Sequence, residues 1–77
     1  MGKTMTRKLR VRYNPIRDEY KIEINNKMVL VTPWEVYVDG DIVAVGRQAK
    51  LLHDAASRRD IATVFSLLQP LLYIASL

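Results

Sequence analysis

Cysteine is absent from this sequence, and histidine occurs only once. The chain therefore has neither a disulfide framework nor a thiolate zinc site, and His53 cannot supply a zinc site by itself. The carboxylates are dispersed, so a site built from clustered oxygen ligands is not expected either. Gly2-Lys3-Thr4 matches the last residues of a phosphate-binding loop motif, but the glycine-rich segment that should precede them is missing. We expect no metal and no cofactor.

The chain is also too short for more than one domain, because it has 77 residues. A domain of this size buries only about 60% of the surface that its unfolded chain exposes. Its hydrophobic fraction of 49% and charged fraction of 26% are those of an ordinary globular domain. The N-terminal residues do not resemble a signal peptide. Together with the lack of cysteine, this predicts a cytoplasmic protein.

Positive charge is concentrated at one end of the sequence. Residues 1–30 hold eight of the twelve Lys and Arg residues and three of the eight acids, whereas residues 31–77 hold four cations and five acids. A localised positive field is typical of proteins with a polyanionic partner. Cations also serve solubility and protect the edges of sheets. Both interpretations stay open at this point.

Apolar and polar residues alternate in the first part of the chain, which predicts an antiparallel sheet over residues 7–46. Asn25-Asn26 accepts the positive φ of a two-residue hairpin turn, and residues 14–19 form the preceding loop. These two turns place apolar residues on the same face of three strands, which supports the register. The predicted pairs are Leu9 with Ile24, Val11 with Ile22, Tyr13 with Tyr20, Ile22 with Val29 and Tyr20 with Val31.

Asp39-Gly40 predicts a second hairpin, with strands over residues 34–38 and 42–45. Its predicted pairs are Tyr37 with Ile42 on one face, and Trp34 with Val45, Val36 with Val43 and Val38 with Asp41 on the other. An alternative exists, because Thr32-Pro33-Trp34-Glu35 also fits the start of a helix. The β-favouring residues that follow favour a strand.

After Gly46 the hydrophobic period lengthens to that of a helix. Ser57 and Asp60 have the spacing of a capping box that begins a second helix. Pro70 is expected to end or kink that helix near Gln69. The apolar side of the first helix is Ala49, Leu52, Ala55 and Ala56, and that of the second is Ile61, Val64, Phe65 and Leu68.

These patterns predict an α+β fold. It consists of a four- or five-stranded antiparallel β-meander followed by two C-terminal helices packed on one face of the sheet. The whole chain, residues 1–77, forms a single domain. Within it we expect a flexible basic N-terminus at residues 1–6, the antiparallel sheet at residues 7–46 and a helical hairpin at residues 47–76.

The candidate binding residues form a ladder of cations on the first two strands and the turn after them. Alternate strand residues lie about 6.6 Å apart on one face, so a phosphate backbone can follow such a stripe. Binding of this kind depends on salt and reads little sequence. An opposed Arg10 and Glu23 would also be an ordinary cross-strand pair. The nucleic-acid-binding residues that we predict are Lys8, Arg10, Arg12, Lys21 and Lys27.

Catalysis has little support in the sequence. His53 and Asp54 are neighbours, but adjacent helical residues do not face each other, so they form no dyad by themselves. A nuclease would need His53 to act with groups from elsewhere, such as Tyr13, Tyr20 or Tyr37. We predict that the protein is not an enzyme and keep the nuclease as the weakest alternative.

The C-terminal segment is unusually apolar. No charged residue occurs from Ile61 to Leu77, and a segment of about 17 residues is at the lower limit for spanning a bilayer. Pro70 and the amphipathic spacing of residues 61–68 favour packing on the sheet, so membrane association is not expected. One small sheet offers little area to cover so much apolar helix. We therefore expect a homo-oligomer, most simply a homodimer formed through the C-terminal region or the second hairpin.

The sequence thus predicts a small basic non-enzymatic binding protein. Its most concrete form is a nucleic-acid-associated regulator that contacts the phosphates of DNA or RNA through a basic strand face. The alternative is a protein–protein adaptor or inhibitor, of the phage or mobile-element type, that acts as an oligomer.

Overall fold

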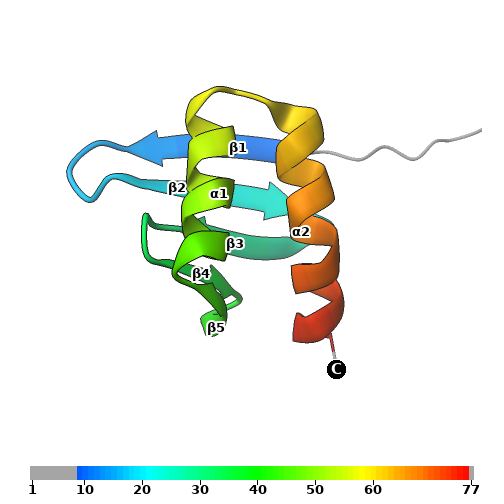
Figure 1. The fold of residues 1–77 in the computed structure, drawn as a ribbon. Helices are drawn as coiled ribbons and strands as arrows, with labels where there is room; N and C mark the ends of the chain where they lie inside the picture. Colours follow the sequence, from blue (N-terminus) through cyan, green and yellow to red (C-terminus); the bar gives the residue numbers. More distant parts are fainter. Residues whose placement is uncertain (1–8, 77) are drawn as a thin grey trace, which may run out of the picture.

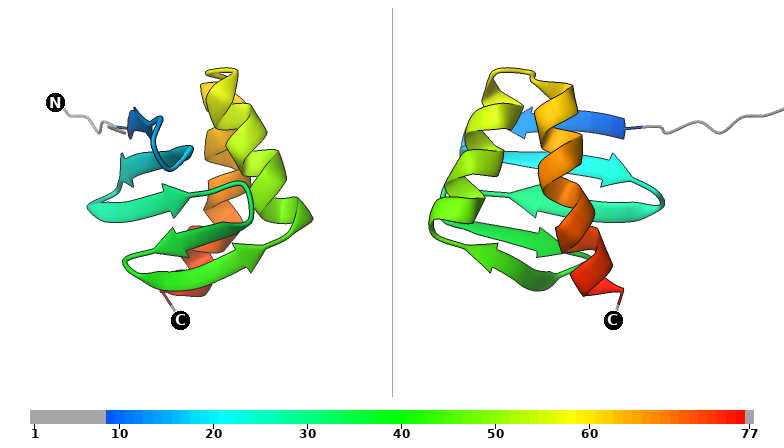
Figure 2. Two further views of the ribbon diagram at one scale, coloured as in Figure 1. Left: turned by 90° about the vertical axis from the view of Figure 1, so that its left-hand side faces the viewer. Right: turned by 45° about the vertical axis from the view of Figure 1, so that its right-hand side comes forward.

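The computed structural model describes residues 9–76 and has the predicted α+β layout. Five antiparallel strands lie side by side in sequence order, and two helices follow them and cover one face of the sheet (Figures 1 and 2). The predicted flexible segment at residues 1–6 lies outside the described residues. The elements are β1 (Leu9–Asn14), β2 (Glu19–Ile24), β3 (Lys27–Val31), β4 (Glu35–Val38), β5 (Asp41–Val45), α1 (Arg47–Ser57) and α2 (Ile61–Ala75).

The register of the first three strands confirms the prediction from the turns. Val11 lies opposite Ile22, which lies opposite Val29 in the next strand. The φ angles of Asn25 and Asn26 are 52° and 64°, as a two-residue turn with two left-handed residues requires. The remaining predicted pairs, Leu9 with Ile24, Tyr13 with Tyr20 and Tyr20 with Val31, also form.

The predicted register of the second hairpin is correct only near its turn. Tyr37 lies opposite Ile42 and Val38 opposite Asp41 as expected, but Val36 pairs with Ala44 and not with Val43. An irregularity between Val36 and Tyr37 accounts for the shift. A bulge adds one residue to a strand and changes which later side chains face the core. Consequently the small side chain of Ala44 is buried beneath the helices, and Val45 is exposed.

Thr32 follows β3 in a turn and does not start a helix. Its Oγ1 accepts hydrogen bonds from the backbone N–H of Trp34 at 3.1 Å and of Glu35 at 2.8 Å. The N–H of Thr32 in turn donates to the carbonyl of Glu35. These bonds satisfy the backbone of a tight connection to β4. Trp34 therefore lies in the turn, and Glu35 rather than Trp34 pairs with Val45.

The hydrophobic core lies between the helices and one face of the sheet. The four residues predicted for the inner side of α1 are all buried, together with Val64 and Leu68 of α2. Three of the α1 residues are alanines, whose small side chains let the helix approach the strands closely. The sheet contributes Tyr20, Ile22, Ile24, Val29, Val31, Val36, Val38 and Ala44 to this core.

The predicted cap of α2 was wrong, and so was the expectation that the helix could end at Pro70. Ser57 is the last residue of α1, and its hydroxyl donates to the carbonyl of Asp54, so it does not cap α2. Asp60 is the N-cap instead.

The helix also continues through Pro70 to Ala75. A proline inside a helix costs about 3 kcal/mol. Burying a Leu contributes about 1.5–3 kcal/mol, and both Leu71 and Leu72 are buried beyond Pro70.

Replacing Asp60 by Ala is expected to lower the melting temperature by about 5 °C at neutral pH. The Asp60 carboxylate accepts from the hydroxyl of Thr63 at 2.7 Å and from its backbone N–H at 3.3 Å. These bonds hold the pKa of Asp60 below its usual value, and the bond from the Thr63 side chain has the largest effect. The stabilisation is therefore complete above the unfolded pKa of about 3.9 and is lost as the pH falls through the folded pKa.

Thermal unfolding followed by circular dichroism at several pH values tests this expectation. The difference between the wild type and Asp60→Ala should shrink as the solution is acidified below about pH 4. Asp60→Asn is the matched control, because it retains a good capping side chain without the titrating group. A difference that stays constant across this pH range would contradict the role of the ionised carboxylate.

Candidate nucleic-acid interface

The helices leave one face of the sheet without a covering element among residues 9–76 (Figure 2). We call this surface the open face. Because strand side chains alternate, it carries the residues whose neighbours point into the core. On β1 and β2 the open face is mainly charged, whereas on β3–β5 it is mainly apolar. Its side chains are Arg10, Arg12, Asn14, Glu19, Lys21, Glu23, Met28, Leu30, Glu35, Tyr37, Ile42 and Val45.

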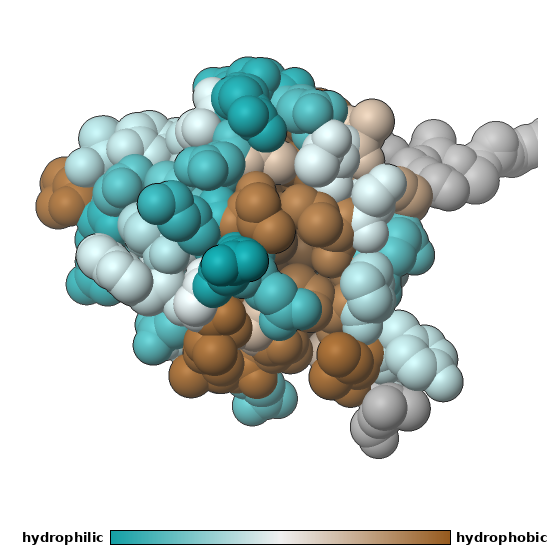
Figure 3. Space-filling model, viewed as in Figure 1, coloured by the Kyte–Doolittle hydropathy of each residue, from teal (hydrophilic) through white to brown (hydrophobic). Residues whose placement is uncertain are grey.

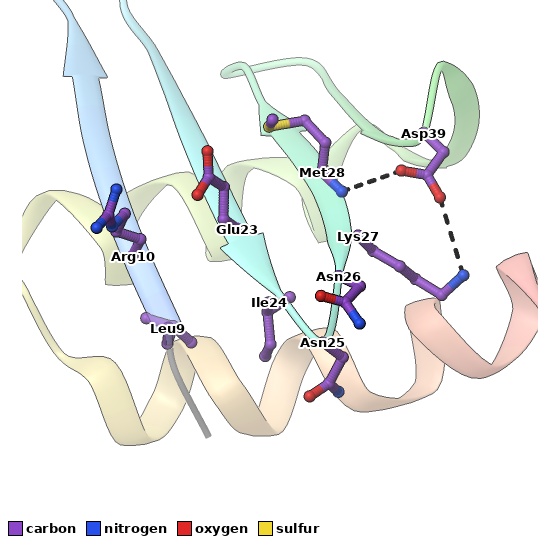
Figure 4. Close-up of a pocket in the computed structure, with 9 residues that line it drawn as sticks. All are labelled: Leu9, Arg10, Glu23, Ile24, Asn25, Asn26, Lys27, Met28 and Asp39. Atoms are coloured by element: carbon purple, nitrogen blue, oxygen red, sulfur yellow. Dashed lines mark hydrogen bonds and ion pairs between the residues drawn. The ribbon is translucent and has the colours of Figure 1, made fainter. Parts of the chain in front are cut away.

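The structure brings three of the five predicted binding residues to the open face. Arg10, Arg12 and Lys21 are exposed there. Lys8 lies outside the described residues. Lys27 is set apart, because its Nζ lies 3.8 Å from Oδ2 of Asp39, and Asp39 also accepts from the N–H of Met28 (Figure 4). Lys27 thus holds the β2–β3 turn against the second hairpin.

Arg12 and Lys21 form the most unusual pair on the open face. They lie directly opposite each other on neighbouring strands, where side chains are about 5 Å apart at Cβ. Like charges in this arrangement are destabilising. No carboxylate of residues 9–76 forms an ion pair with either cation. By contrast, the next cation along β1, Arg10, lies opposite Glu23.

The Arg12–Lys21 pair continues across the sheet as a line of apolar and aromatic side chains. Lys21 lies opposite Leu30, Leu30 opposite Tyr37, and Tyr37 opposite Ile42. We call Arg12, Lys21, Leu30, Tyr37 and Ile42 the central row. It contains no acid, whereas the adjacent rows contain Glu23 on one side and Glu19 and Glu35 on the other. The row was not predicted, because no two-residue turn fixes the register between β3 and β4.

Tyr37 is held in place by a neighbour on its own strand. Its hydroxyl donates to Oε1 of Glu35 at 2.8 Å. This hydrogen bond, together with partial burial, raises the pKa of Tyr37 above its ordinary value. The ring is half-buried, and Ile42 beside it is 54% exposed. The apolar end of the central row is therefore accessible from solution.

Two hollows lie on this side of the molecule. The smaller, of about 310 Å³, is lined by Arg12 and Lys21 with Tyr13, Asn14, Pro15, Glu19 and Leu30. The larger, of about 990 Å³, lies at the opposite end of the first three strands (Figure 4). It contains Arg10 and Lys27 but also Glu23 and Asp39. The smaller hollow suits an anion better, because its two cations outnumber its single carboxylate.

A second polar cluster was missed by the sequence analysis. His53 contacts Asp18 and not its neighbour Asp54: its Nε2 lies 3.0 Å from the carbonyl oxygen and 3.2 Å from Oδ1 of Asp18. The hydroxyl of Tyr13 donates to the same Oδ1 at 2.9 Å, and this bond raises the pKa of Tyr13. The ring of Tyr20 packs against His53 at a centroid distance of 5.0 Å. His53 and Asp18 are separated by 35 in sequence number, so local spacing could not reveal their contact.

This cluster joins the β1–β2 turn to α1. Asp18 has a positive φ of 52°, an uncommon conformation outside glycine that aspartate tolerates. The His53 side chain is only 12% exposed, so little of the ring is open to a substrate. The arrangement therefore supports a structural clamp more strongly than a catalytic site.

The outward surface of the helices carries a further apolar region. Figure 3 shows hydrophobic residues over the seam between α1 and α2. Leu51 of α1 is 51% exposed and Ile74 of α2 is 50% exposed. Helical spacing places Leu51 on the same side of α1 as the buried Ala55, and Ile74 on the same side of α2 as the half-buried Leu67. Part of the apolar C-terminal segment thus stays uncovered in a single copy.

Comparisons with known proteins found no match among protein-family models, curated proteins or solved structures. Within the described residues, no group of three or more His, Asp or Glu side chains is placed to hold a metal ion. None of the helices formed by residues 9–76 has the length and apolar character needed to cross a membrane.

Proposed function

We propose that this chain is a non-enzymatic nucleic-acid-associated regulator that contacts phosphates through Arg12 and Lys21 on the open face. The observation that carries the proposal is the direct opposition of these two cations. Their mutual repulsion is relieved when an anion lies between them, so a bound phosphate gains from both charges. An isolated domain without such a ligand gains nothing from this pair.

The surrounding residues support a polyanion as the ligand. Arg10 lies two residues before Arg12 on the same strand and face, about 6.6 Å away along the chain. The formal net charge of the chain is +4, which favours encounter with a negatively charged partner. Contacts to phosphates carry little sequence information. We therefore propose binding that tolerates different sequences, in DNA or RNA.

Affinity for a labelled single-stranded oligonucleotide is expected to fall steeply with salt. With two or three phosphates neutralised, the slope of log K against log salt should be about −1.4 to −2.1, since each contact to a single strand contributes about −0.7. Fluorescence anisotropy at several salt concentrations measures this slope. Absence of binding at low salt, or an affinity that does not change with salt, would reject the proposal.

The apolar seam supports a second candidate function, self-association with another copy of this chain. Lys50 and Asp54 of α1 and its C-cap residue Arg58 follow one another at four-residue spacing, next to the uncharged helix α2. A copy related by a two-fold axis can oppose cations with acids while burying Leu51 and Ile74. An adaptor or inhibitor acting as an oligomer would use this surface.

Light scattering on concentrated protein tests the self-association. The expected result is twice the mass of one chain, returning to a single mass in Ile74→Lys, which places a charge in the seam. A single-chain mass at every concentration would remove this candidate. The cytoplasmic location inferred from the lack of cysteine stays a prediction.

A further inference from the structure

We propose that the open face binds a single strand, with phosphates at Arg12 and Lys21 and bases lying over Leu30, Tyr37 and Ile42. This inference rests on the proposed function and specifies its ligand as single-stranded nucleic acid. The central row has a cationic end and an apolar end in one continuous line of paired residues. A nucleotide suits both ends, because its phosphate is anionic and its base has an apolar face.

The dimensions of the row fit one or a few nucleotides. Neighbouring strands are about 4.8 Å apart, so Lys21 and Tyr37, two strands apart, are separated by about 9.6 Å, and the whole row spans about 19 Å. The acids in the adjacent rows, Glu23 on one side and Glu19 and Glu35 on the other, disfavour an anion there. The central row is therefore the most favourable path for a polyanion across these strands.

A duplex would make poor use of this surface. Its bases are stacked inside, and reading their edges requires an element that enters a groove. The open face offers strands without a projecting helix (Figure 2). The apolar end of the central row would face the phosphates and sugars of the duplex, and these contacts would add little affinity. In a single strand the base faces are free to stack on an aromatic ring, which is the usual source of affinity in sequence-tolerant single-strand binding.

Tyr37 is the residue that should hold a base. It is the aromatic member of the central row, and its bond to Glu35 restricts its ring before any ligand arrives. A ring that is already ordered loses less conformational entropy on binding. Met28, 39% exposed in the row beside Leu30, extends the apolar surface on one side.

The test compares three labelled probes of equal length: oligothymidine, an abasic deoxyribose-phosphate strand and a duplex. The wild type is expected to bind oligothymidine roughly 5- to 150-fold more tightly than the abasic strand, the range that base stacking supplies. Tyr37→Leu, which keeps an apolar side chain in the sheet, should reduce oligothymidine binding to the abasic level. Tyr37→Phe removes only the hydroxyl and should retain most of the affinity.

The outcomes separate this inference from the function on which it rests. Equal binding of oligothymidine and the abasic strand, or equal loss in Tyr37→Leu and Tyr37→Phe, would overturn base stacking while leaving phosphate binding intact. Tighter binding of the duplex would overturn the preference for a single strand. If none of the probes binds at low salt, both proposals fail. Circular dichroism of each variant confirms that the sheet is folded.

Discussion

Replacing Leu52 by Ala is expected to lower the free energy of unfolding by about 2–5 kcal/mol. Leu52 is fully buried in α1, at 0% exposure, between the helices and the sheet. Removing its side chain forfeits the transfer free energy of the lost atoms and leaves a cavity. Domains are stable by about 0.05–0.15 kcal/mol per residue, so this loss is a large share of the total here.

Leu51→Ala provides the matched control for this change. The two leucines are adjacent on the same helix, but Leu51 is 51% exposed. The same truncation at an exposed position usually changes stability by less than about 0.5 kcal/mol. Urea unfolding of dilute protein measures both variants. A larger loss for Leu51→Ala than for Leu52→Ala would show that α1 packs through the opposite side.

Reversing both charges in Arg12→Glu/Lys21→Glu is expected to weaken binding to single-stranded nucleic acid by roughly 100-fold or more. The estimate follows from two charge-assisted contacts at about 1.5–3 kcal/mol each, with about 1.4 kcal/mol corresponding to a factor of ten. Both side chains are exposed, so folding should be retained. Two opposed glutamates repel each other much as the two original cations do.

The matched control places the same change on the helical side. Arg47 and Lys50 are exposed cations on α1, and Arg47→Glu/Lys50→Glu also lowers the formal net charge from +4 to zero. If overall charge governed binding, both double variants would lose the same affinity. The proposed site requires a much larger loss for the Arg12 and Lys21 pair. Equal losses would contradict a localised interface.

The sequence predicted the first three strands well because their turns are short. Asn25-Asn26 leaves a single register between β2 and β3, and alternation then assigns every side chain to a face. The inner side of α1 was equally predictable, since Ala49, Leu52, Ala55 and Ala56 follow helical periodicity. In both cases, neighbouring residues contain the whole signal.

Features that depend on tertiary packing were not predictable in the same way. The register shift between Val36 and Tyr37 pairs Val36 with Ala44, which is buried, while Val43 packs against the core only in part. Helix α2 continues through Pro70 because leucines beyond it are buried. The contact of His53 with Asp18 and the pairing of Leu30 with Tyr37 join segments whose relative placement no local pattern encodes.

The most direct test of the binding face is nuclear magnetic resonance of ¹⁵N-labelled protein titrated with a short oligothymidine. The proposed site predicts amide shift changes centred on Arg12 and Lys21 and extending to Tyr37, with residues such as Lys50 on the outer side of α1 unaffected. Changes confined to α1 and α2, or none at low salt, would contradict the assignment of the open face as the nucleic-acid interface.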